Sequence, residues 1–221
     1  MRFVLASASP ARLATLRSAG FAPEVQVSGV DEDEALGAAR AARGEEPHGR
    51  HVVGTSTDDD VLVLARAKAE AVAAMQGGEA DAVVLGCDSM LELDGRQLGK
   101  PADAAEAVER WRAMRGRTGV LHTGHWLVDT RAGLREAGAT ASTVVHFADL
   151  SDREVEAYVA TGEPLLVAGA FTVDGLGGPF VTAIEGDYHA VVGVSLPLLR
   201  TLLDELGLTV MDLWSPRVPR A

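Results

Sequence analysis

The strongest constraint on the fold is a continuous apolar run near the middle of the chain, from Ala82 to Cys87, which ends in the carboxylate of Asp88. A run of this kind is typical of a central strand that is covered on both faces of a sheet. Ligand sites of open α/β sheets lie beyond the carboxyl ends of such strands. We therefore expect an α/β protein in which Asp88 faces the ligand cleft and Cys87, on the alternate face, points into the core. A strand-end cap is the alternative role for Asp88.

The start of the chain predicts a second strand that is joined to a helix. Residues 3–6 form a short apolar run, and Pro10 suits the first turn of a helix because its missing N–H group costs nothing there. The junction carries Ser7 and Ser9, and Arg12 follows in the first helical turn. Hydroxyl groups, free N–H groups and an arginine at a helix N-terminus suit an anion such as a phosphate. A plain N-cap is the alternative role for Ser9.

The remaining pattern alternates helices with strands and has no internal repeat or interdomain linker. An Asp-Gly pair at 94–95 predicts a hairpin turn. Residues 37–54 lack clear periodicity, and we expect them to be loose or partly helical at the rim of the protein. Two long strands joined by a tight turn favour a mixed sheet and two lobes. The expected helices cover residues 10–20, 57–75, 103–114, 151–160 and 197–206, and the expected further strands cover residues 25–28, 91–93, 96–98, 120–129, 140–147, 180–184 and 191–194.

Composition and charge narrow the classes of function. The chain has 221 residues, a formal net charge of -12 and a single cysteine. An acidic balance disfavours a nucleic-acid polymer as the partner, because phosphate backbones bind basic surfaces. The sequence contains no apolar run near the ~20 residues that span a bilayer and no leader pattern, so we expect no membrane contact. One cysteine cannot form an internal disulfide, which fits a reducing, cytoplasmic location.

Two features favour an anionic substrate that is bound with a metal ion. Lys68 and Lys100 are the only lysines, and such compact point charges suit phosphate groups. Codon bias towards arginine is the alternative explanation for their rarity. The acidic run 31–34 follows a predicted strand, which makes Glu32 a candidate Mg²⁺ ligand together with Asp88 and substrate phosphates. The usual role of such a charge run is a solvated loop.

Three other segments do not match the binding motifs that they first suggest. The segment 95–100 resembles a P-loop, but its glycines are too close together and Pro101 stands where Ser or Thr should bind Mg²⁺. The segment 175–178 lacks the glycine spacing of a dinucleotide fingerprint. His122 and His125 are three residues apart in a predicted strand, so their side chains point to opposite faces and do not share a metal ion.

The chain resembles the Maf family of nucleoside triphosphate pyrophosphatases, and most closely its actinobacterial branch. The resemblance extends over essentially the whole length, which implies one domain over residues 1–213. From its composition, we expect the tail over residues 214–221 to be frayed. Eight short motifs in the right order carry it. They are Ser7-Ala8-Ser9-Pro10-Ala11-Arg12, Val30-Asp31-Glu32, Ala67-Lys68-Ala69, Gly86-Cys87-Asp88-Ser89, Gly99-Lys100-Pro101, His122-Thr123-Gly124, Ala168-Gly169-Ala170-Phe171 and Ile184-Glu185-Gly186-Asp187-Tyr188.

The resemblance implies an elongated α/β fold shared with the inosine triphosphatase-like enzymes, with a cleft between two lobes and commonly a homodimer. It implies hydrolysis of a nucleoside triphosphate between the α- and β-phosphates, with a divalent cation that is Mg²⁺ or, alternatively, Mn²⁺. Asp88 falls on the family's proton-acceptor position. The positions that line the triphosphate and the metal ion in the family are Ser7, Arg12, Glu32, Lys68 and Lys100 in this sequence.

Three departures from the family concern the nucleobase. Members that favour dTTP and UTP carry Arg, Thr and Gln at the positions of Ala11, Ser89 and Asp174, and members that favour 7-methyl-GTP carry a bulky aromatic residue, Gln and Glu. This chain matches neither set, and its shorter side chains imply a roomier base pocket, so we expect a nucleoside triphosphate of unspecified base. A non-enzymatic nucleotide-binding regulator of septum formation is the second hypothesis, although a pure binder has no need of the general base at Asp88.

Overall fold

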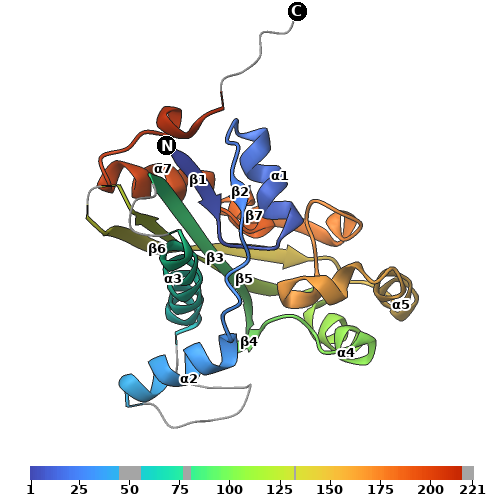
Figure 1. Ribbon diagram of the computed structural model, residues 1–221. Helices are drawn as coiled ribbons and strands as arrows, with labels where there is room; N and C mark the ends of the chain where they lie inside the picture. Colours follow the sequence, from blue (N-terminus) through green and yellow to red (C-terminus); the bar gives the residue numbers. More distant parts are fainter. Residues whose placement is uncertain (45–55, 77–80, 132, 216–221) are drawn as a thin grey trace, which may run out of the picture.

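A mixed sheet of seven strands forms the centre of this computed structural model (Figure 1), which describes residues 1–44, 56–76, 81–131 and 133–215. The strand order is β2-β1-β3-β5-β6-β7, and β4 pairs with β3 beside this path. β1 runs parallel to β2 and β3, whereas the pairs β3–β4, β3–β5, β5–β6 and β6–β7 are antiparallel. The predicted α/β fold with a mixed sheet is therefore confirmed.

Most elements agree with the expected ranges, but the central strand does not end at Asp88: it continues to Leu93, because β5 pairs with it throughout, so Asp88 lies within the strand and not at its carboxyl end. The strands are β1 (Arg2–Leu5), β2 (Glu24–Val25), β3 (Ala82–Leu93), β4 (Arg96–Leu98), β5 (Thr118–Asp129), β6 (Arg135–Phe147) and β7 (Val181–Glu185). The helices are α1 (Pro10–Ser18), α2 (Glu32–Ala42), α3 (Thr57–Met75), α4 (Ala104–Met114), α5 (Asp152–Ala160), α6 (Tyr188–Val192) and α7 (Leu196–Glu205). Short 3₁₀ helices are η1 (Glu163–Leu166), η2 (Ala168–Ala170), η3 (Gly178–Phe180) and η4 (Val210–Leu213).

Local chemistry explains why these elements begin and turn where they do. Ser9 and Ser151 cap α1 and α5 by accepting hydrogen bonds from helical N–H groups, and Ser151 forms the full capping box with Glu154. The β3–β4 hairpin turns at Asp94 and Gly95, whose φ angles of 53° and 70° are those of a type I′ turn. These caps and this turn were readable from sequence because each depends on residues within one turn of chain.

Some expectations were wrong or fall outside the described residues. Residues 191–194 do not form a strand, because Asp187 caps the short helix α6, which ends at Val192 and has Gly193 as its C-cap. The acidic run 31–34 is not a loop but the N-cap and first turn of α2, where carboxylates interact favourably with the helix dipole. Trp214 forms a β-bridge with Phe21 rather than fraying. The remainder of the expected tail (216–221) and of the 37–54 segment (45–54) lies outside the described residues.

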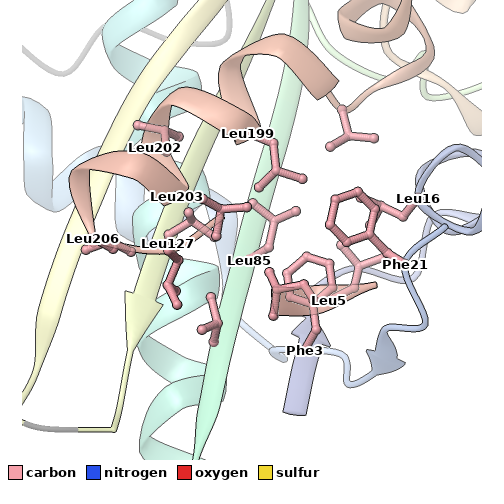
Figure 2. Packing of buried hydrophobic residues seen from close by; sticks show 14 of the residues in the cluster. Phe3, Leu5, Leu16, Phe21, Leu85, Leu127, Leu199, Leu202, Leu203 and Leu206 are labelled. Carbon is pink, nitrogen blue, oxygen red and sulfur yellow. The ribbon is translucent and has the colours of Figure 1, made fainter. Parts of the chain in front are cut away.

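One face of the sheet carries two separate apolar cores. Figure 2 shows the first, in which Leu5 and Leu85 pack against Leu199 and Leu203 of α7 and Leu16 of α1. The second core packs the far end of β3 against α4 and α5, which lie at the opposite end of the molecule from α7 (Figure 1). Cys87 is buried in the first core, as predicted from strand alternation. The face is therefore divided into two lobes.

The opposite face is covered by α3, which approaches the sheet closely at two glycines. A Cβ atom at Gly86 would lie 2.1 Å from the carbonyl oxygen of Ala65, and one at Gly124 would lie 2.3 Å from that of Val61. Both distances are impossible for real atoms, so only glycine permits this contact. The close approach determines how far Lys68, on the same helix, reaches towards β3.

Candidate functional site

A short open stretch in the edge of β3 creates the site. On this edge β1 pairs with β3 as far as Leu85, and β4 pairs with it only from Leu91 onward. β5 occupies the other edge over the whole stretch from Val83 to Glu92. Residues 86–90 therefore have a strand neighbour on one side only, and their outward backbone groups need other partners. The side chain of Arg12 supplies one of them, for the carbonyl oxygen of Cys87.

Arg12 fills this opening. Its guanidinium donates to the carbonyl oxygen of Cys87 at 2.9 Å, to Ser7 Oγ at 3.1 Å, to Ser89 Oγ at 3.0 Å and, through Nε, to the carbonyl oxygen of Gly193 at 2.8 Å. Four of the five N–H donors of an arginine are thus engaged, and within the described part of the chain one Nη2 donor has no partner. Arg12 thus connects the β1–α1 loop, β3 and the residue that follows α6.

A buried hydroxyl chain orients Arg12 from behind. Thr123 Oγ1 donates to the carbonyl oxygen of Ala190 at 2.9 Å and lies 2.9 Å from Ser89 Oγ. Because the single hydroxyl proton of Thr123 is used on Ala190, Ser89 must donate to Thr123. The lone pairs of Ser89 are then free to accept from Arg12. Sequence reasoning missed Thr123, although its place in the His-Thr-Gly motif and its alternation with His122 would have identified it as the inward-facing hydroxyl.

Asp88, Lys68 and Glu32 form the charged centre on the α3 side of the sheet. Lys68 Nζ lies 2.6 Å from Asp88 Oδ1 and 2.6 Å from Glu32 Oε1. The side chains of Lys68 and Asp88 are 12% and 11% exposed, whereas that of Glu32 is 54% exposed. The structure thus brings together three predicted residues from α2, α3 and β3. Two carboxylates share one ammonium, so the group carries a surplus negative charge.

Burial sets the proton affinity of this centre. It raises the pKa of Asp88 above the usual range of an aspartate, and the opposing attraction of Lys68 and Arg12 only partly offsets it. Burial alone would lower the pKa of Lys68, but Asp88 and then Glu32 outweigh it, so the pKa of Lys68 lies above its usual value. Asp88 is therefore a stronger base than an exposed aspartate, and it lies beside a permanent cation.

Lys100, Ser7 and Ser9 lie around the same opening. β4 ends opposite Leu91, so the following residues, Gly99 and Lys100, continue towards the level of Ser89. Lys100 is exposed, and within the described residues its ammonium group forms no ion pair. Ser7 is buried and accepts from Arg12, whereas Ser9 acts as the helix cap, accepting from the Arg12 backbone N–H at 3.4 Å. Among the residues that the structure describes, Lys100 is thus a cation at this edge without an ion pair.

The three residues expected to select the base do not all share one cavity. Ala11 and Asp174 line a surface pocket of about 340 Å³ between α1, α6 and the loop that follows η2. Ser89 is not among the lining residues, because its hydroxyl is held between Arg12 and Thr123. The pocket is further lined by Thr15, Ser18, Tyr188 and His189.

The two histidines have separate structural environments, as predicted. His125 is fully buried: its Nε2 accepts from the Ser195 N–H at 2.8 Å, and its Nδ1 lies 2.9 Å from the carbonyl oxygen of Thr123. His122, on the α3 face, contacts Ser142 Oγ at 2.8 Å. No cluster of three or more metal-ligating side chains occurs among the described residues. No described helix combines the length and apolar character that a membrane crossing requires.

Comparison with known proteins places these features in a family. The Maf-like protein family matches residues 2–206. A nucleoside triphosphate pyrophosphatase of Salinispora tropica is 56% identical over 97% of this chain and 88% of its own length, and one of Streptomyces coelicolor is 55% identical over 97% and 95%. A solved structure titled nucleoside-triphosphatase / dITP/XTP pyrophosphatase, from Mycobacterium abscessus, shares 19% identity with a TM-score of 0.35, covering 68% of this chain and 76% of that chain.

Proposed function

This chain belongs to the Maf-like protein family, and on that basis we propose that it is a nucleoside triphosphate pyrophosphatase that cleaves the α–β phosphoanhydride bond. The observation that carries the proposal is the buried ion pair of Asp88 and Lys68. Lys68 Nζ lies 2.6 Å from Asp88 Oδ1, at an opening bordered by Arg12 and Lys100. A base of raised pKa that is surrounded by cations suits the attack of water on a polyphosphate. Relatives named for this activity cover nearly the whole chain.

The base and the cations have separate roles in the proposed reaction. Asp88 accepts a proton from the attacking water, because its raised pKa brings it closer to neutrality, where general bases work best. Lys68 holds the Asp88 carboxylate in place and keeps a positive charge beside it. Arg12, with one free N–H, and Lys100, whose ammonium is exposed, stabilise the negative charge that grows on the leaving pyrophosphate.

The donors present suit a divalent cation. Glu32 and Asp88 both direct a carboxylate oxygen towards the same ammonium, and one or two carboxylates with substrate phosphates are the set that Mg²⁺ prefers. The surplus negative charge of the centre and the half-exposed side chain of Glu32 support the same assignment. When bound, a divalent cation neutralises phosphate charge and acidifies a coordinated water. Glu32 and Asp88 would hold it, and Mn²⁺ could replace Mg²⁺.

The pocket beside α1 is the proposed base site. It adjoins the Arg12 end of the phosphate site through α1 and α6, and Asp174 and Ala11 lie in its wall. Small side chains at Ala11 and Ala14 leave its α1 wall open. The exposed ring of Tyr188 offers a surface on which a base can stack.

A substrate panel tests the proposal directly. The purified protein is incubated with Mg²⁺ and each of ATP, GTP, CTP, UTP, dTTP and 7-methyl-GTP, and both products are identified. Cleavage at the α–β bond releases pyrophosphate and a monophosphate, whereas cleavage at the β–γ bond releases orthophosphate and a diphosphate. Release of orthophosphate would contradict the proposed bond. Nucleotide binding without any turnover over the whole panel would instead favour the non-enzymatic regulator.

A further inference from the structure

Glu163 lies outside the phosphate site, yet its carboxylate accepts four hydrogen bonds. The hydroxyl groups of Tyr158 and Thr172 donate to Oε1 at 2.9 and 2.5 Å, and the backbone N–H of Gly177 donates to it at 3.0 Å. The backbone N–H of Leu176 donates to Oε2 at 3.0 Å. Three of these four donors belong to residues 172–177, a loop without regular secondary structure between η2 and η3. One carboxylate thus accepts from three donors of this loop, one of which, the Gly177 N–H, is shared with Thr172 Oγ1 at 3.3 Å.

The loop lies so close to the Glu163 carboxylate and to Tyr158 that a side chain at either of two glycines would displace these groups. A Cβ atom at Gly175 would lie 2.5 Å from Glu163 Oε2, and one at Gly177 would lie 2.3 Å from Tyr158 Oη. The Tyr158 hydroxyl also accepts from the Thr172 N–H at 3.2 Å, which ties the start of the loop to α5. The loop therefore takes its shape from Glu163 and Tyr158, both outside it.

Glu163 is charged when it does this. Burial alone would raise its pKa, but the hydrogen bonds from Thr172, Leu176, Tyr158 and Gly177 outweigh burial and lower the pKa below its usual value. Hydrogen bonds to an ionised acceptor are roughly twice as strong as those between neutral groups. An uncharged replacement therefore weakens several contacts of the loop at once.

The loop carries Asp174, which is exposed and lines the pocket together with Ala11. No hydrogen bond of the Asp174 side chain is present among the described residues, so the backbone of the loop decides where this carboxylate lies. We propose that Glu163 is a positioning residue that shapes residues 172–177 so that Asp174 faces the base, and that Glu163 thereby controls recognition of the nucleoside. This inference rests on the proposed function only in assigning the pocket to the base.

The test compares a ligand that has a base with one that lacks it. Dissociation constants are measured by calorimetry for inorganic tripolyphosphate and for α,β-methylene analogues of the six nucleotides of the panel, with Mg²⁺. We expect Glu163→Gln to weaken binding of the preferred analogue about tenfold, the loss of roughly one charged hydrogen bond, and to leave tripolyphosphate binding within about twofold. Glu205→Gln, an exposed change at the end of α7, is the matched control and should change neither value.

A double-mutant cycle separates positioning from a general structural role. If Glu163 acts through Asp174, Glu163→Gln and Asp174→Ala each weaken binding of the analogue. The double variant then binds the analogue only a little more weakly than either single variant does. Additive losses, an unchanged analogue affinity, or an equal loss for tripolyphosphate would overturn the inference. Thr172→Val and Tyr158→Phe each remove one donor, and they give the same test with a smaller effect if Glu163→Gln does not fold.

These binding results do not depend on turnover. If the wild-type protein releases no pyrophosphate while the base-dependent loss of affinity is present, the proposed reaction fails and the positioning role stands. If pyrophosphate is released and Glu163→Gln binds the analogues and tripolyphosphate like the wild type, the positioning role fails and the reaction stands.

Discussion

Two ionic clusters join α2 to the body of the protein, and they are built in opposite ways. At the start of α2, two carboxylates share the ammonium of Lys68, and one of them, Glu32, is half exposed. Further along α2, Asp60 of α3 is fully buried and contacts Arg40 Nη2 at 2.5 Å and Arg43 Nη2 at 3.0 Å. Gln97 donates to the same carboxylate at 2.9 Å.

The difference indicates which cluster is available for chemistry. The carboxylate of Asp60 has donors on both oxygens and no contact with solvent, so it has no capacity for a ligand. The Asp88–Lys68–Glu32 centre is short of positive charge and open at Glu32, which is the condition for binding a cation and a polyphosphate together. Burial of an aspartate is therefore not enough to identify a functional site, and the balance and exposure of its partners decide.

The substitution Asp88→Asn tests the difference between the two clusters most directly. We expect the rate of pyrophosphate release to fall about 10³-fold, since a general base typically contributes 10²–10⁴-fold. The fold should persist, because burial already disfavours the charged form of Asp88 and an amide retains its shape. Initial rates and the urea-unfolding midpoint measure the two effects. A variant that releases pyrophosphate at nearly the wild-type rate would remove Asp88 from the mechanism.

Asp60→Asn tests the other cluster. Removing one partner of a buried ion pair leaves buried charge without compensation, so we expect the free energy of unfolding to fall by about 3 kcal/mol. The rate per folded molecule should change much less than in Asp88→Asn, because Asp60 does not contact the charged centre. Urea unfolding, with rates measured well below the midpoint, gives both numbers. Stability equal to the wild type, together with lost turnover, would reverse the roles of the two clusters.

A pH titration of stability separates the fold from the charged centre. Burial, and then Arg12, lower the pKa of His125 from 6.5 to about 4. The unfolded chain therefore binds a proton at this histidine between pH 6.5 and 4, whereas the folded protein does not. Stability is then present above pH 6.5 and is lost as the pH falls, by about 2 kcal/mol between pH 7 and 5. His125 Nε2 accepts a hydrogen bond from the Ser195 N–H in the folded protein. Protonation would put an N–H group at Nε2, so that two donors would face each other.

His125→Gln is the matched control for this titration. It is neutral at every pH, so the difference in unfolding free energy between pH 7 and 5 should shrink by the same amount. An unchanged slope would show that another group governs the pH dependence of the fold.

The smallest expected effect belongs to Thr123→Val. This change keeps the volume of the side chain but removes the donor to Ala190 and the acceptor for Ser89. We expect a loss of about 1 kcal/mol in stability and a fall of a few fold in kcat/KM, because Arg12, which stabilises the leaving pyrophosphate, is displaced while Asp88 is not. A fall in rate as large as that of Asp88→Asn would place Thr123 nearer to the reaction than the structure does.

Much of the fold was readable from sequence, because its signals are local. Residues 82–88 identified the central strand, and alternation along it correctly placed Cys87 in the core. Helix caps such as Ser151 and the Asp-Gly turn were read from residues that are adjacent in the chain. The predictions that were wrong, at 31–34 and 191–194, concern short segments in which charge or apolar content allows more than one conformation.

The candidate site was predicted as a set of residues but not as a geometry. The sequence by itself determined that Asp88 ends an apolar run, that Ser9 begins a helix and which motifs resemble the family. Only the tertiary structure decided that Glu32 and Asp88 meet at Lys68, because that contact needs α3 to approach the sheet at Gly86. Local periodicity reports on neighbours in the chain, whereas the convergence of three distant segments depends on how their elements pack. For the same reason, the hydrogen bonds between Glu163 and residues 172–177 were visible only in the folded protein.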